Sequence, residues 1–354
     1  TGYWSDVTVK LIDPPKTPKI IPPVGTDAGT VLEGDITFDS LNYMTLPKGT
    51  TTQSNRGRGL IMGGYTPSPT GTNLNSISYI DIASSGYDVD FGDTTQARYA
   101  GGASSSSTRG IYGGGRNPSR VDTIDYVTIA VTGNAIDFGN LSGAAAYNQG
   151  ASNETRGMWF GGSNPPNQIA QIDYVTIAST GNGADFGDLT DARHGGVPVS
   201  STTRAVCMGG HDESNHVNIM DYVTIATTSN ATDFGDLTSA YAYGAGVSNG
   251  VRGLIGGGGN PSGEVNHMDY ITIATTGNSK DFGDLFYARE HLGAVSNSTR
   301  GVWFGGVTPT YQTDIQYAII STTGSAANWG DLTPTLNIGK AYQSGASDSH
   351  GGLV

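Results

Sequence analysis

Charged side chains, cysteine and long apolar runs are all scarce in this 354-residue chain. Only 14% of the residues are charged, and 18 Lys and Arg against 31 Asp and Glu leave a net charge of −13. Without a basic run to bind phosphates, we expect no nucleic-acid partner. No apolar stretch approaches the ~20 residues of a membrane-spanning helix, so we expect no membrane insertion. The single cysteine, Cys207, excludes an intramolecular disulfide and a Cys-rich zinc site.

Glycine is abundant instead, with 54 residues, and Thr, Ser and Asn are also frequent. Aromatic and β-branched residues remain plentiful, so the composition is not that of a disordered chain. A few charges with many turn-forming residues favour an all-β fold rich in tight turns.

The most informative feature is a phrase that recurs about every 48 residues. "IDYVTIASTGNGADFGDL" at 172–189 returns as "MDYITIATTGNSKDFGDL" at 268–285. An aromatic residue at one position of this phrase occurs seven times along the chain. A second feature, "RG" before an apolar run, also occurs seven times if His350 is included, so the sequence predicts seven repeats. The aromatic positions are Phe38, Phe91, Phe138, Phe186, Phe234, Phe282 and Trp329; the second feature begins at Arg58, Arg109, Arg156, Arg204, Arg252 and Arg300, with His350 in the seventh place.

Each period contains four segments that are typical of β-strands. In one period these are "ARHGGVPVS" (192–200), "RAVCMGG" (204–210), "MDYVTIATT" (220–228) and "ATDFGDL" (231–237). The third alternates with a period of two, and "TSN" or "TGN" before the fourth is typical of a hairpin turn. Four antiparallel strands repeated seven times predict an all-β, seven-bladed β-propeller.

The repeat also resembles those of kelch-type propellers, over roughly residues 36–354. The shared features are an Arg-led second strand that ends in a double glycine, a Tyr in the third strand and an aromatic residue in the fourth. Phe replaces the usual fourth-strand Trp except at Trp329. The resemblance implies architecture and no activity. The double glycines begin at Gly63, Gly113, Gly161, Gly209, Gly256 and Gly305, and the tyrosines are Tyr79, Tyr126, Tyr174, Tyr222, Tyr270 and Tyr317.

The ends of the chain suggest how the ring closes. Residues 35–41 are typical of a fourth strand and 341–354 of a first and second strand, so we expect a last blade built from both termini. Its third strand would come from residues 30–34 or be missing. Residues 1–30 are Pro-rich and are expected to form an N-terminal arm or linker, with 31–354 as the propeller.

Few residues resemble a site for catalysis or for a cofactor. Carboxylate pairs such as Asp185 and Asp188 would suit Ca²⁺, but their repetition favours a structural role. The repeated arginines could line an anion-binding channel, although packing on an aromatic ring and pairing with a carboxylate is the favoured interpretation. Cys207 lies in an apolar column and is expected to be buried. No catalytic motif is found, so we expect no enzyme, no metal and no cofactor.

The loop after the double glycine varies most between repeats and is the candidate binding surface. Unconstrained drift of the loop sequences would give the same pattern. "HDESNH" is the one cluster that looks like metal ligands, but it lies in a loop with no spacing tied to a zinc fold. The candidate binding residues are Arg116, Asn117, Arg120, Asn164, Asn167, His211, Asp212, Glu213, His216, Asn260, Glu264 and Tyr311.

The repeated "DYVTIASTGNGADFGDL" (173–189) also resembles kelch-like repeats of tailed-phage structural proteins, and "YWSDVTVKLID" (3–13) resembles the start of phage fibre modules. This resemblance implies a non-enzymatic attachment component on the virion surface or outside the cell: a tail fibre, tail tip or capsid appendage. Its expected partners are other virion proteins and a host-surface glycan or protein, and a homo-oligomer is compatible with this role. The alternatives are a glycan-cleaving propeller enzyme and a cellular kelch-type interaction protein.

Overall fold

The computed structural model of the chain describes residues 57–67, 71–84, 86–332 and 339–353, and the backbone of 37–38 and 44–45. The chain divides into two compact units, Thr1–Arg56 and Gly57–Val354. In the first unit, β1 (Thr37–Phe38) pairs antiparallel with β2 (Met44–Thr45). The division falls later than residue 30, where the sequence suggests the end of an arm; residues 1–30 and the expected strand at 30–34 lie outside the described residues.

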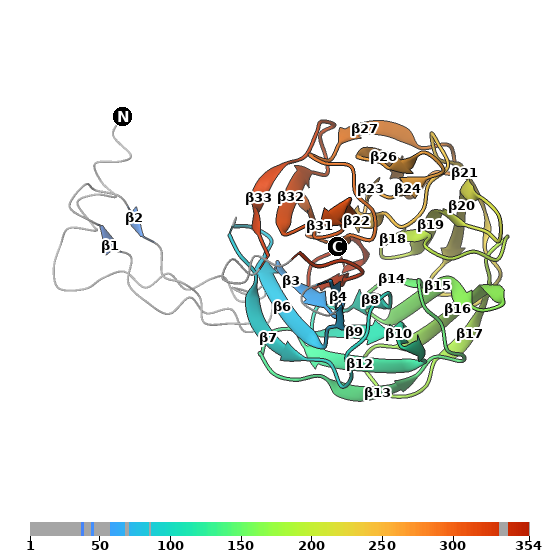
Figure 1. The fold of residues 1–354 in the computed structure, drawn as a ribbon, viewed down its shortest axis with the longest axis horizontal. Coiled ribbons are helices and arrows are strands. Elements are labelled where there is room, and N and C mark those ends of the chain that lie inside the picture. The colour runs from blue at the N-terminus through green and yellow to red at the C-terminus, as the bar shows by residue number, and fades with distance from the viewer. Residues whose placement is uncertain are drawn as a thin grey trace, which may run out of the picture. The chain divides into compact units, whose positions relative to one another are not determined.

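The second unit is a β-propeller of four-stranded antiparallel sheets, arranged as blades around one axis (Figure 1). The predicted architecture of an all-β propeller is confirmed. Blade I contains β34 (Ser344–Ser347), β3 (Arg58–Met62), β6 (Ser76–Asp81) and β7 (Val89–Asp93); blade II contains β8 (Gly102–Ser105), β9 (Arg109–Gly113), β12 (Thr123–Thr128) and β13 (Ile136–Asn140); blade III contains β14 (Gln149–Ser152), β15 (Arg156–Asn164), β16 (Asn167–Thr176) and β17 (Ala184–Asp188); blade IV contains β18 (Val197–Ser200), β19 (Arg204–His211), β20 (His216–Thr224) and β21 (Thr232–Asp236); blade V contains β22 (Ala245–Ser248), β23 (Arg252–Gly256), β26 (His267–Thr272) and β27 (Lys280–Asp284); blade VI contains β28 (Gly293–Ser296), β29 (Arg300–Phe304), β32 (Asp314–Ile319) and β33 (Ala327–Asp331).

The described residues form six blades, so the predicted count of seven is wrong. β34, from the C-terminal segment, pairs with β3 as the innermost strand of blade I, where Ile61 is opposite Gly345. The seventh repeat was inferred from partial phrases around Phe38 and His350. Phe38 pairs with Met44 in the first unit, and His350 precedes the short 3₁₀ helix η2 (Gly351–Leu353). The free edge of β3 accepts the C-terminal strand directly, which closes the ring and leaves no edge for a further blade.

Short hairpins extend the loops between the second and third strands, all on the same side of their blades. In blades III and IV the hairpin continues the long strands β15–β16 and β19–β20. The separate hairpins are β4 (Tyr65–Thr66) with β5 (Thr72–Asn73), β10 (Arg116–Asn117) with β11 (Ser119–Arg120), β24 (Gly259–Asn260) with β25 (Gly263–Glu264), and β30 (Val307–Thr308) with β31 (Thr310–Tyr311).

The hydrophobic core lies between neighbouring blades. In one junction Met208 and Phe234 of blade IV pack with Ile255 and Ile273 of blade V, all of them at most 2% exposed. Each of the other junctions has a cluster of the same kind. Cys207 is buried in one of them, as predicted, and burial raises the pKa of its thiol to about 11. Since both faces of a sheet are covered by neighbours, no blade buries its apolar surface alone.

The repeated arginines connect adjacent blades. The Arg204 guanidinium lies 4.2 Å from the centre of the Tyr222 ring in its own blade and donates to the Ile273 carbonyl of blade V at 3.1 Å. Equivalent arginines do the same around the ring. The predicted stacking on an aromatic ring is confirmed, but the partner in the next blade is a backbone carbonyl rather than a carboxylate.

The repeated phrase also forms a contact at each junction on the outer rim. The Gly277 and Ser279 N–H groups donate to the Phe234 and Asp236 carbonyls at 2.7 and 2.8 Å, and the Asp236 N–H donates to the Asn278 side chain at 3.1 Å. "TGN" of one blade thus binds "DFGD" of the blade before it. The carboxylate of Asp185 accepts from the Gly187 N–H at 3.0 Å, consistent with the structural interpretation of these aspartates.

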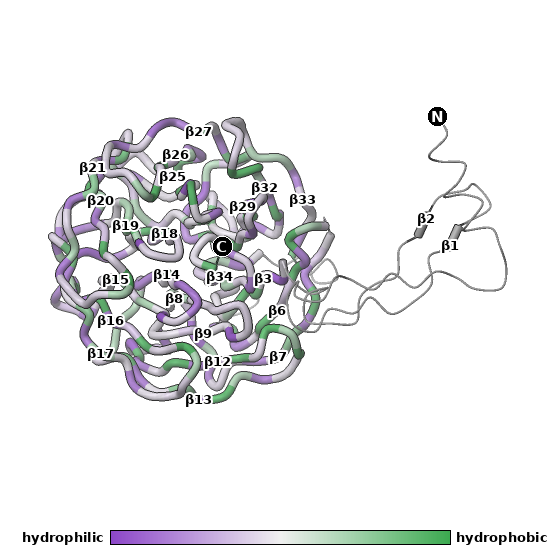
Figure 2. The backbone as a smooth tube through the Cα atoms, turned by 180° about the vertical axis from the view of Figure 1, so that it is seen from behind, coloured by the Kyte–Doolittle hydropathy of each residue, from purple (hydrophilic) through white to green (hydrophobic). Residues whose placement is uncertain are grey.

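Two rings of hydrogen bonds surround the axis. Near one end, six backbone N–H groups each donate to the carbonyl of the preceding ring member, at 2.6 to 3.1 Å. Near the other end, six serine hydroxyls each donate to the carbonyl of the equivalent serine in the neighbouring blade. The C-terminal end lies at the axis in both views of the backbone (Figures 1 and 2), and η2 contacts β14, β18 and β22. The backbone ring comprises Ala100, Tyr147, Gly195, Tyr243, His291 and Tyr342, and the serine ring Ser105, Ser152, Ser200, Ser248, Ser296 and Ser347.

Candidate binding site at the axis

The strongest candidate site is a cavity of about 70 Å³ on the axis, beside the backbone ring. Its lining includes four aromatic side chains, Tyr147, Tyr243, His291 and Tyr342, which we call the aromatic mouth. His291 stacks on Tyr342 with ring centres 4.1 Å apart, and Tyr243 lies 4.5 Å from His291. The aromatic mouth therefore presents a continuous aromatic surface to a ligand.

Each residue of the aromatic mouth has a left-handed backbone conformation. Their φ angles are 59° for Tyr147, 62° for Tyr243, 56° for His291 and 60° for Tyr342. In the equivalent position blade IV has Gly195, at 65°. Glycine adopts this conformation without steric cost, whereas other residues pay about 1–2 kcal/mol. The scaffold needs only a glycine here, so the aromatic rings serve something other than the backbone ring, and strain of this kind often marks a functional site.

Large residues alternate with small ones around the axis. Tyr147, Tyr243 and Tyr342 stand in every second blade, and Ala100 and Gly195 stand between them. His291 breaks the pattern, because it is a large residue at a position where alternation would place a small one. Tyr243, His291 and Tyr342 therefore lie side by side, and Tyr147 faces them across the axis with ring centres 6.0 to 6.3 Å away.

The side chains of the aromatic mouth are uncharged at neutral pH. Burial, and then the nearby His194, lower the pKa of His291 to about 3, and burial raises the pKa of Tyr243 to about 12. The remaining residues that line the cavity are neutral. His194, at the edge, donates to or accepts from the Tyr243 hydroxyl at 2.6 Å, and burial followed by His211 lowers its pKa to about 4.

More rings surround the mouth and connect it to the variable loops. Tyr65 contacts Tyr99 and Tyr311 with ring centres 5.6 and 5.9 Å apart. On another side, His211 lies 5.4 Å from His194 and 4.8 Å from His216. Loops from several blades therefore contribute to one surface.

The predicted binding residues all lie in these loops, but only some lie near the mouth. Besides the rings above, the Arg120 Nε donates to the Ser163 carbonyl at 3.3 Å, and Asn117 accepts from Asn73 at 2.9 Å, which joins neighbouring loops. Arg116 helps to lower the pKa of Tyr147, a smaller effect than the burial that raises it.

The other predicted residues are at hairpin tips. Asn164 and Asn167 are exposed and pair with each other. The Asp212 carboxylate accepts from the Ser214 and Asn215 N–H groups, which lowers its pKa, and Glu213 is exposed. Asn260 accepts from the Ser262 N–H at 2.8 Å, and Glu264 is exposed. In the described part of the chain, no three His, Cys, Asp or Glu side chains are placed to hold a metal ion.

The aromatic mouth is not among the binding residues predicted from the sequence. Its residues immediately precede the first strands of their blades, for which the sequence patterns predict a strand and no site. A signal was present: Tyr147, Tyr243 and Tyr342 occupy a column where Gly195 shows that no side chain is required. Their convergence on the axis depends on the closure of the ring, which local patterns do not show.

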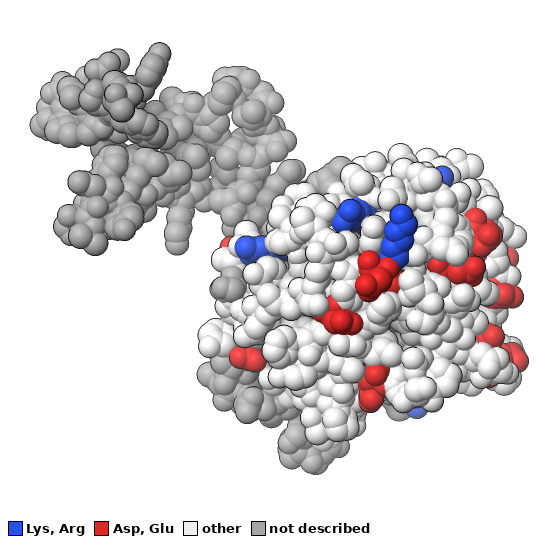
Figure 3. Space-filling view, turned by 90° about the horizontal axis from the view of Figure 1, so that it is seen from above, with Lys and Arg blue, Asp and Glu red and all other residues white. Residues whose placement is uncertain are grey.

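Charge around the propeller fits a neutral rather than an anionic ligand. On the side seen in Figure 3, acidic side chains are scattered among neutral ones with a few basic groups between them. Glu290 is half-buried beside the mouth, and burial followed by Glu264 raises its pKa. A phosphate or sulfate group would meet no cation in the lining of the cavity.

No family model matches the sequence, and no curated protein shows significant sequence similarity to it. Within the described residues, no helix combines the length and the hydropathy needed to cross a membrane.

Proposed function

We propose that this chain is a non-enzymatic attachment component of a phage particle, a kelch-like propeller of a tail fibre, tail tip or capsid appendage. Its aromatic mouth and surrounding loops bind a host-surface glycan. The particle and the kelch relationship rest on the resemblance of the repeats. The observation that carries the binding role is the set of aromatic rings held at left-handed φ around the axis.

An uncharged sugar suits this mouth chemically. The apolar faces of sugar rings pack on aromatic side chains, and hydroxyl groups pair with the phenol oxygens of Tyr147, Tyr243 and Tyr342. Tyrosine supplies large contact area at little cost in side-chain entropy. The cavity of about 70 Å³ is too small for a whole sugar ring, so the ligand would lie across the mouth and send one substituent inward.

The binding role predicts that Tyr243→Gly lowers glycan affinity but leaves the fold intact. Because Gly195 occupies the equivalent position, the fold should tolerate the change, while glycan affinity falls by about 30-fold, or ~2 kcal/mol. A glycan array would identify a ligand, and calorimetric titration would give the affinities. Tyr87→Ala, which removes a tyrosine that is 56% exposed outside the lining of the cavity, is the matched control.

Equal binding by wild type and Tyr243→Gly would contradict a site at the mouth. Release of reducing sugar from the bound glycan would instead favour the glycan-cleaving enzyme. Glu290 would then be the general acid, because a carboxyl group with a raised pKa is suited to donate a proton.

The particle location predicts labelled fibres, tail tips or capsid surfaces in immunogold electron microscopy with an antibody against residues 57–354. Label confined to the cell interior or envelope would contradict the attachment role. That result would favour a cellular interaction protein of the kelch type.

A further inference from the structure

A buried aspartate recurs in the third strands and binds the segment that leads into its blade. In blade IV the Asp221 carboxylate accepts from the Thr190 hydroxyl at 2.7 Å and from the Thr190 N–H at 3.2 Å. It also pairs with Arg193, whose Nη2 lies 2.8 Å from Oδ2, and both side chains are fully buried. The guanidinium thus neutralises a carboxylate that has left water.

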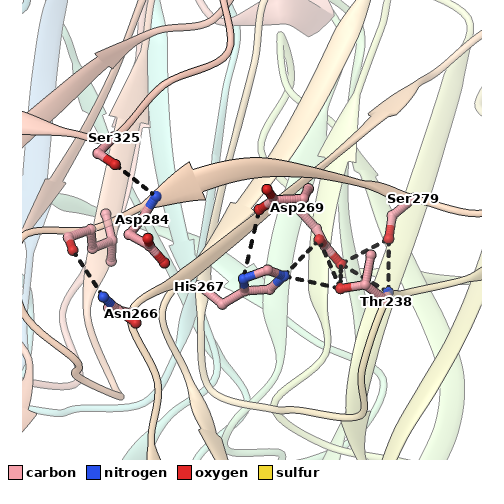
Figure 4. Close-up of polar contacts among 9 residues, drawn as sticks. Thr238, Asn266, His267, Asp269, Ser279, Asp284 and Ser325 are labelled. Carbon is pink, nitrogen blue, oxygen red and sulfur yellow. Dashed lines mark hydrogen bonds and ion pairs between the residues drawn. The ribbon is translucent and has the colours of Figure 1, made fainter.

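Blades II and VI also have an arginine at the position of Arg193, whereas blade V has Tyr241 there and contacts its aspartate through His267, at the position that Gln171 holds in blade III. Arg98 pairs with Asp125 at 2.9 Å in blade II. In blade VI Gln316 stands in place of the aspartate, and Arg289 pairs with Asp314, two residues before it, at 2.6 Å. In blade V, Figure 4 shows Asp269 in contact with the His267 imidazole, at 3.0 Å.

Blade III has the aspartate without the arginine. Ala145 stands where blade IV has Arg193, and Asp173 is only 7% exposed. Its carboxylate accepts from the Ser142 N–H and hydroxyl at 3.0 and 2.7 Å and from the Gln171 amide at 3.2 Å, all neutral donors. Burial raises the pKa of Asp173 as a result. A buried carboxylate without a cation is a costly arrangement.

A cavity of about 40 Å³ occupies the space that the arginine fills elsewhere. Its lining includes Ala145, Gly161 and Asp173, and Ser142 and Gly143 at its edge are exposed to solvent. By the usual measure the cavity holds roughly three water molecules, which is close to the size of a guanidinium group.

The donor pattern of a guanidinium also matches the lining. Asn148 lines the cavity, is 1% exposed, and its Oδ1 has no hydrogen-bond partner among the described residues. In blades IV and VI the arginine also donates to the carbonyls of Gly209 and Gly305, each at 2.9 Å. Gly161 is the equivalent glycine in blade III.

We propose that the cavity at Ala145, Gly161 and Asp173 is a binding site for a guanidinium group, supplied by a free small cation or by an arginine of a partner protein. The planar donor fork of guanidinium pairs with a carboxylate while its remaining N–H groups reach the oxygens nearby. A divalent metal fits less well, because it requires more oxygen ligands than this cavity offers. The site is separate from the mouth and does not depend on the glycan hypothesis.

Calorimetric titration of the whole chain with methylguanidinium tests this inference, with urea as the neutral planar control at the same ionic strength. Saturable binding of methylguanidinium, absent with urea, is the expected result. Ala145→Arg fills the site from within and should abolish this binding, and Asp173→Asn should weaken it at least tenfold.

The source of the group is tested by repeating the titration with Nα-acetyl-arginine amide. Binding of both probes would show that a partner's arginine can enter, and binding of methylguanidinium alone would favour a free cation; either result supports the site. No saturable binding by wild type, or equal binding by wild type and Ala145→Arg, would overturn it. Because the wild-type titration is decisive alone, the test remains valid if a variant does not fold.

Discussion

Equivalent residues in different blades form an internal comparison within one chain. Arg193 and Ala145 occupy the same position, and each faces a buried aspartate, Asp221 or Asp173. The two blades share the fold of this segment, so the arginine is not required to form a blade. Its contribution is electrostatic, since it stabilises a charge that burial would otherwise penalise.

Ala145→Arg should therefore raise the free energy of unfolding at neutral pH, by about 1–3 kcal/mol. Burial raises the pKa of Asp173, so the stability linked to this group is present below its unfolded pKa and is lost as pH rises through the folded pKa. The arginine removes that loss, so the gain should vanish at acidic pH, where Asp173 is protonated. Urea denaturation at both pH values measures it.

The reverse change, Arg193→Ala, is the matched control and should cost about 3–5 kcal/mol by leaving Asp221 buried without its cation. An Ala145→Arg variant that gained the same stability at both pH values would show that packing, not charge, is responsible.

At the scale of elements, the recurrent phrase serves the junction between blades rather than the blade itself. Gly235 has φ +139°, and a Cβ on it would lie 2.6 Å from the backbone of Gly277 in the next blade. The fourth strand therefore requires glycine at its point of contact with the next blade, whereas the hairpin turn does not, because Ser229 takes the place of Gly277 at the junction with Gly187. Each copy of the phrase therefore takes part in two junctions: its "TGN" turn contacts the blade before it, and its "DFGD" strand contacts the blade after it.

One short strand, β34, connects the two ends of the ring. Removing residues 344–354 should expose the edge of β3 and lower the melting temperature well beyond the effect of removing 351–354, which takes only η2. The physical reason is that the deletion opens a ring in which every blade depends on two neighbours. Thermal unfolding followed by circular dichroism compares the three proteins. Equal melting temperatures for the full chain and the longer deletion would show that closure by β34 is unimportant.

At the scale of the whole molecule, two closed rings of hydrogen bonds define the axis. The serine ring and the backbone ring each contain one member per blade. Because the rings are closed, the side chains that leave them are held in fixed positions relative to one another. The glycan site proposed at the aromatic mouth would benefit from this rigidity, since a preorganised site loses less entropy on binding.

The sequence by itself determined the repeat unit, the strands within it and the all-β propeller. These follow from local patterns: the strands predicted at 204–210 and 220–228 correspond to β19 and β20, and glycine and asparagine mark the turns between strands. The positions of the loops between the second and third strands are also visible, because these loops vary most between the copies in the chain itself.

Only the tertiary structure decided the number of blades, the aromatic mouth and the cavity beside Asp173. Whether a partial repeat at each end makes a new blade or completes an existing one depends on which strand edge is free, and β3 supplied that edge. Tyr147 and Tyr342 meet although they are far apart in sequence, because ring closure brings the starts of all first strands to the axis. Patterns along the chain report local preference, whereas these features arise from contacts between distant blades.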